Sequence, residues 1–405
     1  MDKYIHRSLE PFLLKAIHQF PVVLLTGPRQ AGKTTLLRNF LGSEFRYVSL
    51  DPMDVRAAAA SDPRGFLEQN PPPVILDEVQ NAPDLLPYIK QRVDEQRDIP
   101  GRYLLSGSQN LLVLERASET LAGRVAILRL FPLSLREILG RPGSGLPWET
   151  AGVPALRGPA HLDLWRLFLR GGYPELAARP DLDAALWHSS YVQTYLERDV
   201  RALRQVGDLG PFRDFLSILA ARSGNLLNLT DVGRDLGIVA NTIRAWLSIL
   251  ESTFQIIVLR PWFENVGRRL VKMPKVYLSD TGVLCHLAGL TDAAHSAAGP
   301  LSGAILETAV VGEVFRTILH RGETPRLHFW RTSTGLEVDL VVEAAGRLVP
   351  VEVKATSTPR PAMAAGIEAF RRDYAERVAP GFVIHSGDIR LPLVPGVEAV
   401  PFGQM

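Results

Sequence analysis

Two short segments in the first third of the chain carry residues that could bind and cleave a nucleoside triphosphate. The first contains Gly27, Gly32, Lys33 and Thr34 in the spacing G-x-x-x-x-G-K-T, between an apolar run and a helical pattern. Glycines let backbone N–H groups curve around phosphates, the helix start adds partial positive charge, the lysine reaches the terminal phosphates and the threonine hydroxyl binds Mg²⁺. The residues predicted to bind ATP are Gly27, Pro28, Arg29, Gln30, Ala31, Gly32, Lys33, Thr34 and Thr35.

The second segment, VILDEVQ, places two adjacent acids at the end of an apolar strand. Parallel α/β sheets bind ligands at the carboxyl ends of their strands. Asp77 is therefore predicted to hold Mg²⁺ together with Thr34, and Glu78 to act as general base toward the attacking water. Two adjacent acids often occur at a strand end by chance, but this is less frequent in a chain that also has a phosphate-binding loop upstream. The pair thus favours ATP hydrolysis, with Lys33 and Glu78 catalytic, over ATP binding alone.

Other residues are candidates for contacting the terminal phosphate. Ser106 ends an apolar strand and could sense this phosphate, with Ser108 and Gln109 as alternatives. Arg29 lies inside the loop, and Arg124 could act as an arginine finger on the nucleotide of a neighbouring subunit. For Arg124 the alternative is a surface or structural role. A finger that acts in trans would predict a nucleotide-dependent homo-oligomer.

A second group of chemically suggestive residues lies near the C-terminus. Asp339 and the pair Glu352 and Lys354 fall on two predicted strands, and Glu307 falls on the preceding helix, where Glu313 is an alternative. Two carboxylates can hold a divalent metal, Mg²⁺ or Mn²⁺, that polarises a phosphodiester while a lysine positions the attacking water. Because side chains alternate along a strand, Glu352 and Lys354 are predicted to share one face. These residues predict a metal-dependent nuclease site.

The elements around this site are predicted from periodicity. A helix at 303–319, strands in LHFWRT, LEVDLVVE and LVPVEVKA, a helix in AAGIEAFRRDYAE and a strand in GFVIHS follow one another. This is the order of the PD-(D/E)XK nuclease-like fold. The alternative is a degenerate domain of that fold, in which the acid and the lysine form only a salt bridge.

The middle of the chain has a winged-helix outline. Three helical patterns and an apolar strand pair follow one another between residues 212 and 261, with a turn at Gly237 and a helix starting near Ala240. Such a helix could enter the major groove of DNA, although winged helices also bind proteins. The candidate nucleic-acid contacts are Asn241, Thr242 and Arg244 on this helix and Arg268, Arg269, Lys272 and Lys275 near the wing.

Composition sets broad limits. The chain has 405 residues, 46% hydrophobic and 22% charged, as in soluble globular proteins, and its net charge of +2 is too small to require a polyanionic partner. The single cysteine, Cys285, excludes an intramolecular disulfide and a multi-thiolate zinc site, and is predicted to be buried. The N-terminus lacks the apolar core of a secretory signal, and no segment is long and apolar enough to span a bilayer. These features predict a cytoplasmic protein without a membrane partner.

Stretches rich in turn-forming residues divide the chain. The predicted fold class is α/β, with an AAA-like P-loop ATPase core of the ASCE type, built on a parallel sheet, at 1–138. A linker at 139–160, a helical or winged-helix domain at 161–286 and a nuclease-like α/β domain at 305–405 follow.

The motifs together resemble a known family. GPRQAGKTT, VILDEVQ, LLSGSQ and LAGR, followed by FLRGGYPE, YLERDV and KVYLSDTGVLCHL, look like the AAA-like ATPases of bacteria and archaea whose C-terminal half is a domain of unknown function. The resemblance covers nearly the whole chain and implies the P-loop fold and the use of ATP. It names no substrate.

Two hypotheses follow from these patterns. In the first, the protein hydrolyses ATP and acts on DNA through its winged helix and its nuclease-like domain. In the second, it is a nucleotide-dependent signalling or regulatory switch whose C-terminal domain is catalytically inactive and binds protein partners.

Overall fold

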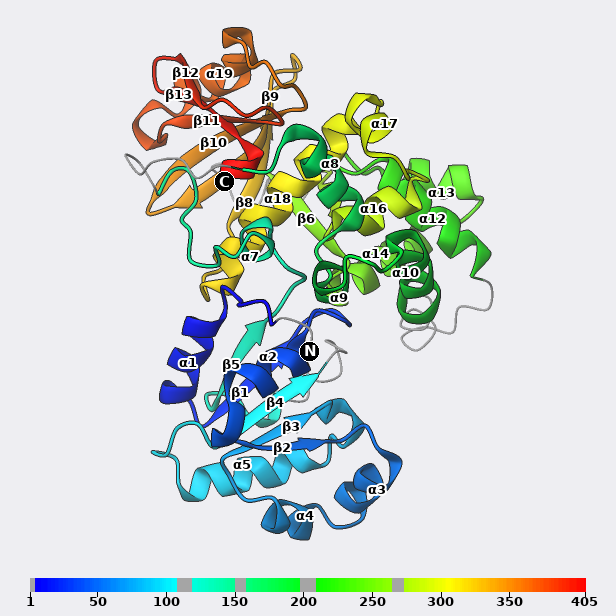
Figure 1. The fold of residues 1–405 in the computed structure, drawn as a ribbon, viewed down its shortest axis with the longest axis vertical. Coiled ribbons are helices and arrows are strands. Elements are labelled where there is room, and N and C mark those ends of the chain that lie inside the picture. The colour runs from blue at the N-terminus through cyan, green and yellow to red at the C-terminus, as the bar shows by residue number, and fades with distance from the viewer. Residues whose placement is uncertain (1–3, 108–118, 150–157, 197–208, 264–272) are drawn as a thin grey trace.

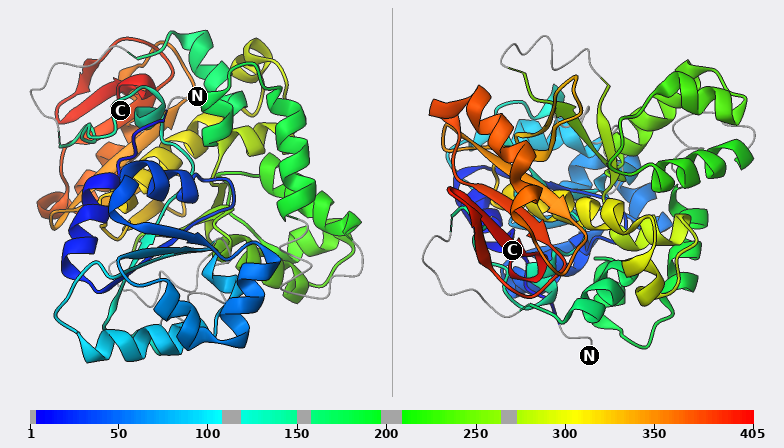
Figure 2. Two further views of the ribbon diagram at one scale, coloured as in Figure 1. Left: turned by 60° about the horizontal axis from the view of Figure 1, so that its bottom comes forward. Right: turned by 90° about the horizontal axis from the view of Figure 1, so that it is seen from above.

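The computed structural model describes residues 4–107, 119–149, 158–196, 209–263 and 273–405. Figure 1 shows the N-terminal part, in blue and cyan, below a larger part that contains the middle and C-terminal residues. In the right-hand view of Figure 2, seen from above, the orange and red C-terminal elements lie in front of the blue N-terminal part.

The N-terminal part is built on a five-stranded sheet in the order β2-β3-β4-β1-β5, in which every neighbouring pair is parallel. The strands are β1 (Val22–Thr26), β2 (Arg46–Ser49), β3 (Val74–Asp77), β4 (Tyr103–Gly107) and β5 (Val125–Arg129). The predicted parallel sheet is confirmed. Because β4 lies between β1 and β3, the carboxyl ends of these three strands meet at one edge.

Helices cover both faces of this sheet. They are α1 (Glu10–Gln19), α2 (Lys33–Phe40), α3 (Met53–Ser61), α4 (Pro63–Gln69) and α5 (Leu85–Glu95). All five residues of β1 are buried, and the strands contribute to two apolar clusters, one on each face. This double burial explains why the strands are continuous apolar runs.

The middle residues form mostly helices. Those described are α7 (Leu135–Ile138), α8 (His161–Arg170), α9 (Pro174–Ala178), α10 (Ala184–Tyr191), α12 (Gly210–Ala221), α13 (Leu229–Leu236), α14 (Ala240–Ser252) and α16 (Thr281–Leu287). Between α13 and α14 the chain turns at Gly237, whose φ of 68° lies in the left-handed region that glycine adopts without steric cost. The antiparallel pair β6 (Ile256–Pro261) and β7 (Lys275–Leu278) follows α14. The three helices and β6 lie where the sequence predicted them, but the second strand of the pair lies at Lys275–Leu278, beyond the predicted span of 212–261.

The C-terminal residues form a mixed sheet. The helices of this part are α17 (Ala293–Ala298), α18 (Ser302–His320) and α19 (Ala365–Asp373). The strands that it contributes to the sheet are β8 (Leu327–Arg331), β9 (Glu337–Ala344), β10 (Arg347–Lys354), β11 (Gly381–His385), β12 (Leu391–Val394) and β13 (Val397–Pro401). Strands β8, β9 and β10 are antiparallel neighbours, and β11 is parallel to β10.

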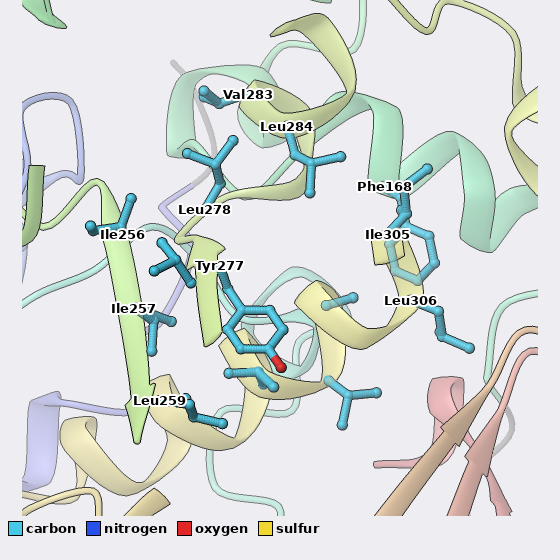
Figure 3. Packing of buried hydrophobic residues seen from close by; sticks show 14 of the residues in the cluster. Phe168, Ile256, Ile257, Leu259, Tyr277, Leu278, Val283, Leu284, Ile305 and Leu306 are labelled. Atoms are coloured by element: carbon cyan, nitrogen blue, oxygen red, sulfur yellow. The ribbon is translucent and has the colours of Figure 1, made fainter. Parts of the chain in front are cut away.

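This sheet also incorporates the strand pair of the middle residues. The complete order is β12-β13-β11-β10-β9-β8-β6-β7, with β6 parallel to β8. One apolar cluster extends from Leu135 to Met405 and includes side chains of both parts. In Figure 3, side chains of the strand pair, such as Ile256 and Tyr277, and of α18, such as Ile305 and Leu306, belong to this one cluster. The middle and C-terminal residues therefore share one sheet and one core.

A buried ionic cluster joins the N-terminal part to α18. The carboxylate of Glu137, which is fully buried, has one oxygen 3.3 Å from Nε of Arg7 and 3.4 Å from Nδ1 of His320. Arg7 also donates a hydrogen bond of 2.9 Å to the carbonyl of Ala31, within the predicted phosphate-binding loop. Burial alone would favour a neutral carboxyl, but Arg7 and His320 lower the pKa of Glu137 well below its ordinary value. Through His320, helix α18 thus contacts the ion pair of Glu137 and Arg7 beside that loop.

Among the residues that the structure describes, no helix combines the length and the apolar character needed to cross a membrane.

Candidate functional site

The glycine-rich segment forms a loop between β1 and α2. Gly27 has a φ of 149°, and a β-carbon there would lie 2.0 Å from the carbonyl oxygen of Leu130, so the position requires glycine. Lys33, the first residue of α2, is buried, and its Nζ donates hydrogen bonds to the carbonyls of Gly27 (3.0 Å) and Pro28 (2.8 Å). The lysine ammonium and the start of a helix are therefore both held at this loop.

Asp77, at the carboxyl end of β3, is the centre of a hydrogen-bonded group. One carboxylate oxygen accepts bonds from the hydroxyls of Thr34 (2.8 Å) and Tyr47 (2.6 Å), and the other from Ser106. Asp77 and Ser106 are buried. The structure thus brings together Thr34, Asp77 and Ser106, which lie on three different elements. This oxygen-rich set fits Mg²⁺, a hard cation that prefers oxygen ligands.

Tyr47 is a member of this group that the sequence analysis missed. It lies on β2, next to β3 in the sheet, where its ring also contacts the guanidinium of Arg38. Burial and the hydrogen bond to Asp77 raise the pKa of the Tyr47 hydroxyl, which therefore stays protonated and donates to the carboxylate. In the sequence, Tyr47 could have been found only from the alternation of side chains along its strand, if that strand had been predicted to lie next to the one that ends in Asp77.

Glu78 follows directly after β3 and has an unusual backbone. Its φ of 58° and ψ of 48° lie in the left-handed region, which a residue with a side chain rarely adopts. Its carboxylate accepts a hydrogen bond from the Gln80 side chain. Such a conformation costs about 1–3 kcal/mol and is concentrated at functional sites.

A cavity of about 460 Å³ adjoins the loop. Its lining comes from the N-terminal segment, the loop with α2, and α9 with its flanks, and includes Tyr4, Ile5, Arg7, Gln30, Gly32, Thr35, Leu36, Asn39, Leu133, Pro174, Glu175 and Ala178. Arg7 lines it while bonding to Ala31. With the stretch at Leu133, four separate segments therefore enclose space beside the predicted phosphate site.

The other phosphate-contact candidates have different outcomes. Ser108 and Gln109 lie outside the described residues. Arg29 is half-buried. Arg124 lies just before β5, at the edge of the sheet opposite the loop, and its guanidinium binds both carboxylate oxygens of Asp94 at 2.6 and 3.1 Å. It cannot reach the nucleotide site of its own chain, so only an action in trans is left for the predicted finger.

The candidate nucleic-acid contacts are only partly described. Asn241 and Arg244 are exposed in the first turns of α14, where Arg244 donates a 3.1 Å hydrogen bond to Asn241, and Thr242 is half-buried. Arg268, Arg269 and Lys272 lie outside the described residues. The prediction that Lys275 contacts phosphates is wrong, because this lysine is buried among carboxylates.

The C-terminal candidates converge on one pocket of about 470 Å³. Asp339 on β9, Glu352 and Lys354 on β10, and Glu307 on α18 all line it. Lys354 Nζ lies 2.5 Å from Glu352 Oε1, as expected for neighbours on one strand face, and Asp339 Oδ2 accepts a 2.9 Å hydrogen bond from the backbone N–H of Val353. Burial and the nearby charge of Asp339 raise the pKa of Glu352 to about 8 and that of Glu307 to about 7.

Glu313, the alternative to Glu307, lies elsewhere. Its fully buried carboxylate accepts a 2.8 Å hydrogen bond from the backbone N–H of Leu135 and lies 3.2 Å from Nε of Arg136. The suggestion that Glu313 contributes to the C-terminal pocket is therefore wrong.

The metal prediction for this pocket meets an obstacle. Within the described part of the chain, no group of three or more His, Cys, Asp or Glu side chains is arranged to hold a metal ion. The Nζ of Lys275 instead lies 3.0 Å from Glu307 Oε1 and 3.6 Å from Asp339 Oδ1, and it contacts Glu337. Two of the three carboxylates predicted to bind a metal, Glu307 and Asp339, thus contact a lysine that the sequence analysis did not place there, whereas Glu352 binds Lys354.

Comparison with known proteins divides the chain much as its motifs do. The model of an AAA domain matches residues 19–139, and models of two domains of unknown function, DUF8612 and DUF4143, match residues 161–294 and 302–405. Among solved structures, the chain resembles the Walker-type ATPase PABY2304 of Pyrococcus abyssi, with 16% identity, 70% of this chain and 96% of that chain covered, and a TM-score of 0.41. It also resembles the RuvB Holliday junction branch migration motor of Thermotoga maritima, with 20% identity, coverage of 62% and 88%, and a TM-score of 0.28.

Two curated relatives match almost the whole chain. The uncharacterized proteins Rv2008c of Mycobacterium tuberculosis and Mb2031c of Mycobacterium bovis are each 34% identical over 396 residues, which are 97% of this chain and 82% of the relative. Together with the AAA-domain match, this likeness supports the predicted P-loop family. The chain belongs to the family of these mycobacterial proteins, with an AAA domain in its N-terminal part and a domain of unknown function, DUF4143, at its C-terminal end.

Proposed function

We propose that the N-terminal part hydrolyses ATP with the help of Mg²⁺. The observation that carries this proposal is the hydrogen-bonded group around Asp77, in which Thr34 of the phosphate-binding loop and Ser106 of β4 meet the buried carboxylate. These residues are far apart in sequence. An aspartate with only a structural role would have no reason to bind the threonine of a glycine-rich loop. In this loop, Lys33 also lies against the backbone carbonyls.

Each residue has a distinct role in the proposed reaction. Lys33 and the backbone N–H groups of the loop bind the phosphates, and Arg29 is near enough in sequence to contact the outermost one. Thr34 and Asp77 would hold Mg²⁺, which when bound supplies positive charge to the phosphate oxygens. Glu78 orients the attacking water and accepts its proton, while Ser106 contacts the terminal phosphate. The cavity beside the loop is the proposed site for the base and ribose.

Turnover with and without a chelator tests this function. We expect purified protein with ATP and Mg²⁺ to release ADP and inorganic phosphate in equal amounts, and excess EDTA to stop the release, because Thr34 and Asp77 act through the metal. Coupled-enzyme and malachite green assays measure the two products. Calorimetry that detects no ATP binding would rule out the proposal.

We further propose that the C-terminal part has the PD-(D/E)XK nuclease-like fold. The order α18, β8, β9, β10, α19, β11, with an antiparallel triplet followed by a parallel strand, supports this assignment. The convergence of Asp339, Glu352 and Lys354 in one pocket supports it as well. Retention of a fold does not imply retention of its chemistry.

Contact with DNA through α14 is the proposed link between these activities. The exposed Asn241 and Arg244 at the start of this helix support it. We expect the double substitution Asn241→Ala/Arg244→Ala to weaken binding to duplex DNA by about thirtyfold or more, because each of the two contacts to a base contributes roughly 1–3 kcal/mol. Fluorescence anisotropy at fixed salt measures the change.

Arg372→Ala on α19, which is also exposed, is the matched control and should leave DNA binding unchanged. Equal affinity of the double variant and the parent protein would remove α14 from the interface. This result would favour the second hypothesis, in which the protein is a nucleotide-dependent regulatory switch that binds protein partners.

A further inference from the structure

Lys275 lies in the pocket beside Glu307 and Asp339, two of the carboxylates predicted to hold a metal ion. Its Nζ contacts carboxylate oxygens of Glu307 on α18 and of Glu337 and Asp339 on β9. An ammonium group has three N–H donors and no acceptor, so three carboxylates satisfy it. Glu307 is fixed in addition by a 2.6 Å hydrogen bond from the hydroxyl of Tyr277. The side chains around the ammonium are therefore already arranged around a cation that the chain itself provides.

The ammonium is held firmly in this position. Lys275 is only 4% exposed, lies at the start of β7, and its Nζ lies 5.6 Å from the centre of the Phe329 ring. Burial by itself would favour the neutral amine, but Glu307, Asp339 and Glu337 raise the pKa of Lys275 above its ordinary value. The positive charge is therefore permanent at physiological pH, and a dication placed beside it would be repelled.

One oxygen of the pocket still lacks a partner. Glu352, whose side chain is 9% exposed, uses Oε1 to bind Lys354, but its buried Oε2 has no hydrogen-bond partner among the described residues. Buried carboxylate oxygens are normally paired. Glu352 lines the pocket, so this oxygen is a hydrogen-bonding position that a bound molecule could use.

From these contacts we infer that Lys275 replaces the divalent metal of the nuclease-like site, so that the C-terminal pocket is a metal-independent binding site. The inference rests on the nuclease-like fold proposed above, and it excludes metal-dependent phosphodiester cleavage while Lys275 stays in place. A ligand for the pocket would form a hydrogen bond with Oε2 of Glu352. The carboxylates themselves remain suitable metal ligands once the internal cation is removed.

Mn²⁺ titration without nucleotide tests the inference. The measurement uses the full chain carrying Asp77→Asn, which removes the metal ligand at the phosphate-binding loop, and follows Mn²⁺ binding by electron paramagnetic resonance. We expect no binding at the C-terminal pocket when Lys275 is present. Adding Lys275→Met, which keeps an unbranched side chain one atom shorter but removes the charge, should create a site that binds Mn²⁺ at least about tenfold more tightly.

Two further variants make the result specific. Lys275→Arg keeps the positive charge and should bind no Mn²⁺, whereas adding Glu352→Gln to the Lys275→Met protein should weaken the new site. Mn²⁺ binding by the protein with Lys275 intact, lost on Asp339→Asn, would overturn the inference. That titration needs no Lys275 variant, so it decides the matter even if Lys275→Met does not fold. Failure to hydrolyse ATP would not affect any of these readouts.

Discussion

Replacing Glu78 by glutamine is expected to slow ATP turnover by about 10²–10⁴-fold while leaving ATP binding nearly unchanged, the range typical of a lost general base. Glutamine preserves the size of the side chain, but its amide cannot accept the proton of the attacking water. Lys33, Thr34 and Asp77, which are proposed to bind the phosphates and Mg²⁺, are untouched. The variant should therefore trap ATP.

Single-turnover hydrolysis and calorimetric titration with ATP measure the two properties separately. Glu95→Gln, an exposed substitution at the end of α5, is the matched control and should hydrolyse ATP at the parental rate. If Glu78→Gln lowered affinity and turnover by the same factor, Glu78 would be a ligand of the nucleotide rather than the base. Parental turnover would exclude it from the reaction altogether.

Replacing Glu137 by glutamine is expected to destabilise the protein by about 3–5 kcal/mol, the usual loss when one partner of a buried ion pair is removed. Glu137 is fully buried beside Arg7 and His320, and it accepts hydrogen bonds from the backbone N–H groups of Ser8 (2.7 Å) and Ser134 (2.9 Å). The glutamine variant would leave the charge of Arg7 buried without its counter-ion. The midpoint of urea unfolding at pH 7 measures the effect.

The same cluster predicts how stability depends on pH. The pKa of Glu137 is lower in the folded protein than in the unfolded chain, so the stability that it contributes is complete at neutral pH. It is lost progressively as the pH falls below the unfolded value of about 4.3. The difference in stability between parent and Glu137→Gln should therefore shrink in acid. Glu376→Gln, an exposed substitution, should lose no stability, and a similar loss in both variants would contradict the proposed burial effect.

The phosphate-binding loop and the acidic strand could be predicted from sequence because their chemistry lies within short continuous segments. The spacing from Gly27 to Thr34 and the adjacency of Asp77 and Glu78 are set by the order of residues in the chain and do not depend on the fold. The apolar runs before them indicate strands in any fold with a doubly covered sheet. The convergence of Asp339 and Glu352 was also predictable, because neighbouring strands joined by a short turn must lie side by side.

The partners that come from distant elements could not be predicted. Tyr47 reaches Asp77 only because β2 is the neighbour of β3, and Arg7 reaches the loop from ahead of α1. Lys275 was expected near a wing as a phosphate contact, yet it lies in the carboxylate pocket because β6 pairs with β8. That pairing joins strands 66 or more residues apart (from 261 to 327), and no periodicity in either segment indicates it.

The sheet shared by β6, β7 and the C-terminal strands has a consequence for how the chain can be divided. A fragment that begins at residue 302, where the DUF4143 match starts, would expose the edge of β8 to other chains and would bring four acids together without Lys275. A fragment that ends there would leave β6 equally uncovered. The boundary between the DUF8612 and DUF4143 matches is thus visible in the sequence but does not separate two folding units. Cutting the chain at this point would yield two fragments that aggregate instead of two independently folded domains.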